Sequence, residues 1–178
     1  MKNVLFAISI MAICGINYSC NSSKTGKNSS SSTKPSTGTT KPEEVGIGEI
    51  SKETLVNFYV TDQLTAVMEK AKREKKVVFI DFFTTWCAPC RMMDQSVFVD
   101  EDVATYMNQN CINMKINAEK GEGVALKLQY NINAYPSYIF INADGDEVIK
   151  KEGSLSIEDF KKLMKTGVWK VKNPTGNP

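Results

Sequence analysis

The segment that decides the fold of this chain holds a pair of closely spaced cysteines and reads Phe82-Phe83-Thr84-Thr85-Trp86-Cys87-Ala88-Pro89-Cys90-Arg91. An apolar run of β-branched and aromatic residues, from Val77 to Ile80, leads into it and predicts a buried strand. The residues from Arg91 to Gln95 that follow favour a helix. The two cysteines therefore lie where a strand ends and a helix begins.

This position gives the two cysteines a specific chemistry. A thiol at the start of a helix faces unpaired backbone N–H groups and the positive end of the helix dipole. Both favour the thiolate form of Cys87, and the thiolate is the nucleophile in thiol–disulfide exchange. Cys90 is close enough along the turn to attack a mixed disulfide on Cys87 and release the bound molecule. Pro89 suits the first helical turn, where its missing N–H costs nothing.

The cysteine pair has two other readings. It could be half of a zinc site, but zinc needs a second pair of ligands and the chain contains no histidine. It could also be an inert structural disulfide. We expect a redox-active disulfide between Cys87 and Cys90, with no bound metal and no separate cofactor.

The composition excludes several classes of function. The chain has 178 residues, of which 42% are hydrophobic and 24% charged, and this suits one globular domain with an unstructured remainder. The net charge of +2 comes from interspersed charges of both signs, so we expect no nucleic-acid partner. The absence of histidine excludes the usual serine–histidine and cysteine–histidine catalytic groups. The five cysteines are too few and too irregularly spaced for a disulfide scaffold.

Residues 1–19 have the features of a signal peptide. Lys2 supplies the positive start, and the apolar stretch from Val4 to Ile16 has the length of a signal core but is short for a membrane span. Ser19 before Cys20 resembles the lipobox of bacterial lipoproteins, in which a cysteine after a small residue is lipidated and becomes the mature N-terminus. We expect lipidation at Cys20. The alternative is an ordinary secretory signal with an incidental cysteine.

Residues 20–44 form the predicted linker. Ser, Thr, Lys, Gly and Pro dominate it, and it contains no aliphatic or aromatic residue. Such a segment cannot bury apolar surface, so we expect a disordered tether that holds a domain away from a membrane. Residues 45–178 are the expected folded domain.

Predicted strands and helices alternate along this domain in the order β-α-β-α-β-α-β-β-α. The strands are expected at residues 55–60, 77–83, 112–116, 137–141 and 147–151. The helices are expected from 61 or 62 through 71, from 87 with a pause near 97–98 and a resumption from 100 to 110, then from 123 to 130, and from 156 through 164.

Taken together, these features resemble the thioredoxin superfamily over most of residues 45–170. The segment from Phe79 to Arg91 is similar to the active-site segment of the family, and Tyr135-Pro136-Ser137 is similar to its cis-proline loop. The resemblance implies an α/β, thioredoxin-like fold with a central mixed sheet and helices on both faces. The spacing of elements is most similar to membrane-tethered periplasmic members. These are the C-terminal domain of the thiol:disulfide interchange reductase and the thioredoxin-like proteins of cytochrome c maturation.

The resemblance also implies roles for the cysteines and for two charged residues. Cys87 is the expected nucleophile and Cys90 the resolving thiol. Asp81 matches the buried carboxylate that helps to deprotonate the resolving cysteine, and burial would raise its pKa enough to make it a usable base. Lys115 matches the lysine that pairs with this carboxylate in some members. The alternatives are an ordinary strand-end acid for Asp81 and a solvent-facing lysine for Lys115.

Three residues are expected at or near the substrate surface. Trp86 either lines this surface or packs in the core. The Tyr135–Pro136 peptide bond should be cis, and the backbone of Tyr135 should pair with an extended substrate strand. Two further expectations concern residues outside this surface: Cys111 should be a buried hydrophobic thiol, and Asp94, like the acidic residues 100–102, a solvated residue at a helix start.

The expected function is that of a thiol:disulfide oxidoreductase in the bacterial cell envelope, as a periplasm-facing membrane lipoprotein or a soluble periplasmic form. Ala88-Pro89 is close to the Gly-Pro of reducing members, which favours a reductase of protein disulfides. Its partners would be protein thiols and disulfides, a membrane thiol reductase as electron donor, and the membrane itself through the lipid anchor. One alternative is a non-catalytic binding module for extended protein segments. The other is an oxidase that donates disulfides.

Overall fold

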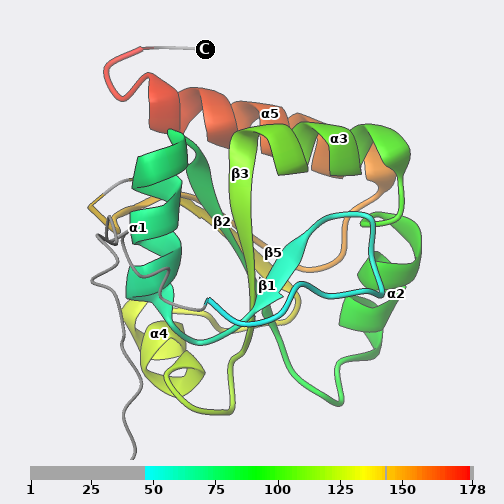
Figure 1. The fold of residues 1–178 in the computed structure, drawn as a ribbon. Helices are drawn as coiled ribbons and strands as arrows, with labels where there is room; N and C mark the ends of the chain where they lie inside the picture. The colour runs from blue at the N-terminus through cyan, green and yellow to red at the C-terminus, as the bar shows by residue number, and fades with distance from the viewer. Residues whose placement is uncertain (1–46, 143, 177–178) are drawn as a thin grey trace, which may run out of the picture. The chain divides into compact units, whose positions relative to one another are not determined.

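A computed structural model of the chain describes residues 47–142 and 144–176 (Figure 1). The predicted signal peptide, the lipidation site Cys20 and the predicted linker lie outside the described residues. These features therefore stay predictions.

The fold is built on a five-stranded mixed sheet with the strand order β1-β3-β2-β4-β5. The strands are β1 (Phe58–Val60), β2 (Val77–Phe83), β3 (Cys111–Asn117), β4 (Ser137–Ile141) and β5 (Glu147–Glu152). β1, β3 and β2 run parallel to one another, whereas β4 pairs antiparallel with both β2 and β5. The central strand is thus β2, the strand that leads into the cysteine pair.

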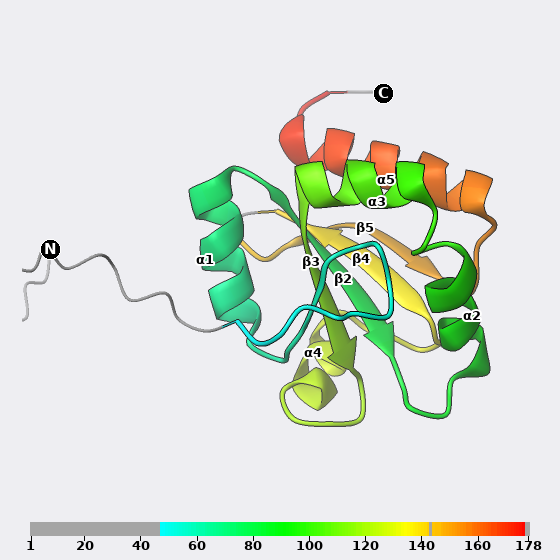
Figure 2. The same ribbon diagram turned by 45° about the vertical axis from the view of Figure 1, so that its right-hand side comes forward.

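Helices cover both faces of this sheet, as the sequence predicts. They are α1 (Leu64–Glu74), α2 (Ala88–Ser96), α3 (Glu101–Asn110), α4 (Gly123–Gln129) and α5 (Ile157–Lys172). Buried side chains of α1 and α4 share one apolar cluster with one face of the sheet, and those of α2, α3 and α5 share another with the opposite face. Figures 1 and 2 show α3 and α5 side by side on the second face.

The two faces of β2 explain why its sequence is almost continuously apolar. Val78 and Ile80 point into the cluster beneath α1, whereas Val77 and Phe79 point into the cluster beneath α3 and α5. A strand that is buried on both sides has no polar face, so the alternation of an exposed strand is absent. Asp81 is the one charged residue of this strand, and it is only 1% exposed.

Among the differences from the predicted elements, three concern β1, α5 and the region between α2 and α3. β1 is restricted to Phe58–Val60, because the amides of Leu55 and Val56 both donate to the carbonyl of Phe98 and not to a neighbouring strand. α5 runs to Lys172, well beyond the predicted end. The expected pause after the cysteine helix is a complete break, since α3 begins a new helix with the Asp100 carboxylate accepting the amide of Val103.

Candidate functional site

The two cysteines lie at the first turn of α2, directly after the C-terminal end of β2. Cys87 is the residue that caps the helix, and its Sγ accepts the backbone N–H of Cys90 at 3.1 Å. Pro89 occupies the first turn, where no N–H is needed. The local sequence therefore builds the arrangement that stabilises a thiolate at the N-terminus of a helix.

Cys87 and Cys90 are joined by a disulfide bond. In this oxidised state Cys87 is 1% exposed and Cys90 is 3% exposed. Trp86, the residue before the pair, is 65% exposed, which excludes the core-packing alternative for this side chain. The exposed ring of Trp86 therefore provides an apolar surface next to the buried disulfide.

Beneath α2 lies a cluster of three charged side chains. Lys115 Nζ lies 2.6 Å from Asp81 Oδ2 and 2.7 Å from Asp94 Oδ1. The parallel register of β2 and β3 places Asp81 opposite Lys115, and α2 brings Asp94 over both. The predicted pair of Asp81 and Lys115 is therefore present, and the solvent-facing alternative for Lys115 is wrong.

The electrostatics of the cluster follow from its burial. Burial raises the pKa of the Asp81 carboxyl above its usual value, although the charge of Lys115 opposes this change. For Lys115, burial alone would lower the pKa, but the charges of Asp81 and Asp94 outweigh it and hold the pKa above its ordinary value. The second oxygen of Asp81, Oδ1, has no hydrogen-bond partner among the described residues. It is the oxygen available to accept a proton.

The expectation for Asp94 was wrong. The sequence predicts a solvated residue at a helix start, but Asp94 lies inside α2 and its side chain is only 16% exposed. It follows Cys90 by four positions, so both residues lie on the same face of the helix. This spacing is the signal that could have identified Asp94, because the same face also carries the buried cysteine.

A cleft of about 780 Å³ adjoins this cluster. Its lining includes Cys90, Asp94 and Lys115 on one side and the segment from Glu49 to Glu53 on the other. Asp81 is not among the lining residues. The cleft therefore borders Cys90 and Asp94, while Asp81 lies behind Lys115.

The predicted cis-proline loop lies on the side of Trp86. The Tyr135–Pro136 peptide bond is cis, as the sequence predicts. The rings of Tyr135 and Trp86 meet edge to face with their centroids 6.0 Å apart, so the two predicted substrate-surface residues lie together. Among the described residues, neither the amide nor the carbonyl of Tyr135 takes part in a backbone hydrogen bond. This backbone is available to an extended partner.

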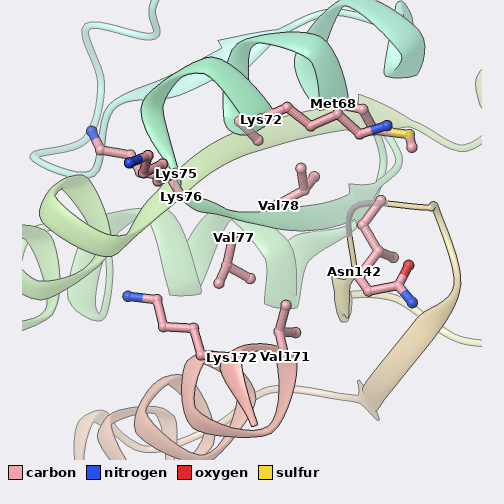
Figure 3. Close-up of a pocket in the computed structure, with 11 residues that line it drawn as sticks. Met68, Lys72, Lys75, Lys76, Val77, Val78, Asn142, Val171 and Lys172 are labelled. Carbon is pink, nitrogen blue, oxygen red and sulfur yellow. The ribbon is translucent and has the colours of Figure 1, made fainter. Parts of the chain in front are cut away.

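Two features lie apart from this site. Cys111 is a buried free thiol, and burial raises its pKa to about 12, so it is unreactive at neutral pH. A second cavity of about 320 Å³ opens at the N-terminal end of β2, away from the cysteine pair (Figure 3). Val77 and Val78 are among its lining residues, together with lysines from α1 and α5. None of the residues of the cysteine site lines this cavity.

Within the part of the chain that the structure describes, no group of three or more His, Cys, Asp or Glu side chains is arranged to hold a metal ion. A search of the same residues for a helix with the length and apolar character of a membrane span finds none.

Comparisons with known proteins agree with this geometry. A family model described as a thioredoxin-like domain matches residues 64–167. Thioredoxin H4 of Arabidopsis thaliana is 31% identical over 116 residues, which are 64% of this chain and 92% of that protein. The thiol:disulfide interchange protein DsbD of Campylobacter jejuni is 26% identical over 115 residues, which are 64% of this chain and 20% of that protein. A solved candidate disulphide-isomerase from Bacteroides thetaiotaomicron is 36% identical with a TM-score of 0.57, covering 68% of this chain and 94% of that one.

Proposed function

The chain belongs to the thioredoxin-like family, and from this premise we propose that it is a thiol:disulfide oxidoreductase that reduces protein disulfides outside the cytoplasm. The observation that carries the proposal is the disulfide between Cys87 and Cys90 at the N-terminus of α2, the helix whose Asp94 shares Lys115 with the buried carboxylate of Asp81. An inert structural disulfide has no need of that carboxylate or of the helix position that favours a thiolate.

The reaction begins with the reduced form of the pair. The Cys87 thiolate, stabilised by the N–H of Cys90 and by the helix N-terminus, attacks one sulfur of a substrate disulfide. A bond forms between Cys87 and that sulfur, and the substrate disulfide breaks. The other substrate sulfur leaves with the electron pair and takes up a proton from solvent.

In the second step the mixed disulfide is resolved. Asp81 accepts the proton of the Cys90 thiol on Oδ1, the carboxylate oxygen without a partner. The Cys90 thiolate then attacks Cys87, so the intramolecular disulfide forms and the substrate departs as a thiol after taking a second proton. The enzyme loses two electrons and the substrate gains them.

The substrate segment binds along the surface formed by Trp86 and Tyr135. The unpaired backbone of Tyr135 supports this assignment, because it can add an extended chain as a short strand. In this proposal the aromatic rings contact the side chains of the substrate, and the backbone hydrogen bonds set its direction.

Turnover requires that the oxidised enzyme be reduced again. We propose a membrane thiol reductase as the electron donor and lipidation of Cys20 as the membrane anchor. The support for the anchor is the sequence around Cys20 and the polar stretch that follows it. The support for the exchange chemistry is the similarity to the thiol:disulfide interchange protein DsbD.

Reduction of insulin by the full chain, with dithiothreitol as reductant, tests the proposal. Wild-type protein should catalyse the reaction and Cys87→Ser should abolish it. Cys90→Ser protein, first reduced and then mixed with insulin after removal of the dithiothreitol, should accumulate a mixed disulfide between Cys87 and an insulin chain, which mass spectrometry identifies. Cys111→Ser is the matched control and should keep full activity, because Cys111 lies outside the site.

Two results would contradict the proposal. Catalysis that survives Cys87→Ser would exclude Cys87 as the nucleophile. Absence of both catalysis and trapped insulin would favour the binding-module alternative, in which the same aromatic surface holds a partner without exchange.

A further inference from the structure

The charges beneath the active site do not balance as a simple ion pair. Two carboxylates, Asp81 on β2 and Asp94 on α2, share the single ammonium group of Lys115. With all three groups ionised, the cluster carries a net charge of −1 in a largely buried place. One added proton makes it neutral.

Without Asp94, the cluster would be neutral before Asp81 takes up a proton and positively charged afterwards. Asp81 and Lys115 alone would form a neutral pair, and a proton taken up by Asp81 would leave Lys115 as a buried cation without a partner. Such an uncompensated charge is costly in the protein interior. The carboxylate of Asp94 therefore decides whether Asp81 can accept a proton at low cost.

In the part of the chain that the structure describes, Lys115 has no ion-pair partner other than Asp81 and Asp94. Its Nζ lies 5.2 Å from the ring centres of Phe58 and Phe83 and 5.6 Å from that of Phe98. Aromatic faces attract a cation but carry no net charge. The remaining titratable or charged neighbours are Tyr138 from β4, Cys90 and Arg91 from α2, and Glu49, Lys52 and Glu53 across the cleft.

We propose that Asp94 is a positioning residue that keeps Lys115 ion-paired while Asp81 carries the proton taken from Cys90. The inference rests on the proposed function for the step that it serves, but the arrangement of charges exists without turnover. During resolution the proton moves from Cys90 Sγ to Asp81 Oδ1, and Lys115 stays bound to Asp94. After the Cys87–Cys90 disulfide forms, Asp81 returns the proton to solvent and the original cluster is restored.

Titration of the Asp81 carboxyl group by NMR, in the reduced full chain, tests this directly. Asp94→Asn should lower the titration midpoint of Asp81 by about one pH unit, the size expected when a buried ion pair loses its competing carboxylate. Asp94→Glu keeps the charge and should restore the wild-type midpoint. The matched control is Asp102→Asn, which removes an exposed carboxylate paired with Lys161 and should change nothing.

A second background tests whether the effect passes through Lys115. In Lys115→Met protein, Asp94→Asn should shift the Asp81 midpoint by much less than in the wild type. A shift of equal size in both backgrounds would mean that Asp94 acts by direct repulsion, and the role assigned to Lys115 would be overturned. An unchanged midpoint in the Asp94→Asn protein would overturn the whole inference.

Single-turnover kinetics separate this inference from the proposed function. Release of substrate from the Cys87 mixed disulfide is followed as a function of pH. Asp94→Asn should move the midpoint of the profile to lower pH and slow the release roughly three- to tenfold, because Asp81 becomes a weaker base. Slower release with an unchanged midpoint would indicate a merely structural role for Asp94. If the wild type itself shows no release, the proposed function fails, while the NMR titration still decides the inference.

Discussion

Asp81 is buried more completely than an ionised carboxylate normally tolerates. It is 1% exposed, and its one ion-pair partner within the described residues, Lys115, is already shared with Asp94. Burial raises the pKa of Asp81, so the folded protein binds this proton more tightly than the unfolded chain does. The stability that comes from this proton is present below the unfolded pKa, about 4. It is lost as pH rises through the raised value.

Replacement of Asp81 should therefore stabilise the protein at neutral and alkaline pH. In Asp81→Asn the cluster keeps only Lys115 and Asp94, which form a neutral pair. Thermal unfolding of the reduced proteins should show equal stability near pH 4 and an advantage for Asp81→Asn that grows as pH rises. Resolution of mixed disulfides should slow at the same time.

The exposed acid Asp144 provides the control for this measurement. Asp144→Asn should follow the wild-type stability curve at every pH. If Asp81→Asn is instead less stable than the wild type above pH 7, the ion pair with Lys115 outweighs the cost of burial, and the assignment of Asp81 as a readily protonated base is wrong.

The sequence predicts individual site residues to different extents. The roles expected for Cys87 and Cys90 follow from local features, since a strand, a turn and a helix start are visible in adjacent residues. The contact of Lys115 with Asp81 depends on the register of β2 and β3, which join segments 34 positions apart. Asp94 requires in addition the rotation of α2 over the sheet. Strand register and helix rotation are tertiary features. The sequence alone therefore does not decide between the paired and the solvent-facing position of Lys115, and it wrongly predicts that Asp94 is solvated.

Among the helices and strands, α5 is an example in which tertiary packing, and not the local helix propensity of the sequence, determines the length of the element. The sequence predicts this helix only through residue 164, and the helix continues to Lys172. Gly167 interrupts the helix-forming pattern, but the structure buries it against Phe140 of β4. A side chain at this position would hold α5 away from the sheet.

Gly167→Ala should therefore destabilise the protein, although alanine favours helix formation over glycine by up to about 1 kcal/mol. The added Cβ would lie 2.5 Å from Cδ2 of the fully buried Phe140 ring. Overpacking of this kind typically costs about 1–3 kcal/mol. Denaturant unfolding should show a lower midpoint for this variant.

Thr166→Ala is the matched control, because Thr166 is exposed on the same helix. It should leave the midpoint unchanged or raise it slightly. A Gly167→Ala protein that is as stable as Thr166→Ala would show that α5 can move away from Phe140 without cost.

The order of strands and helices is predictable because each segment carries its own pattern, although the pause predicted near Val97 and Phe98 is a complete break between α2 and α3. The start of β1 could not be predicted in this way. Leu55 and Val56 have the composition of a strand, but their amides donate to the carbonyl of Phe98 in the loop between α2 and α3. This loop lies more than 40 positions away along the chain, and no local pattern indicates it.

For the molecule as a whole, the predicted domain boundary near residue 45 implies that the stability of the folded domain does not depend on residues 1–44. A chain that begins at Val45 should unfold at the same temperature as the full chain, because we expect the folded domain to bury its core without the predicted signal peptide and polar tether. A chain that begins at Gly48 also lacks Ile47, which is 7% exposed in the core beside α1. It should lose about 1.5–3 kcal/mol of stability.

Calorimetry of the two shortened chains and the full chain checks this. Equal stability of the chain from Val45 and the full chain supports the boundary. A clear loss of stability on removal of residues 1–44 would mean that this part packs on the domain, which a disordered tether does not do.

The central claim, that Cys87 and Cys90 form a reducing redox couple, is tested most directly by the reduction potential of this couple. The full chain is equilibrated with dithiothreitol or glutathione buffers, and free thiols are then alkylated and counted. The account predicts a reversible two-electron couple near the value of thioredoxin, about −270 mV. A potential near that of a strong disulfide donor, about −120 mV, would reverse the direction of electron flow. The absence of any reversible couple would contradict the assignment of an oxidoreductase altogether.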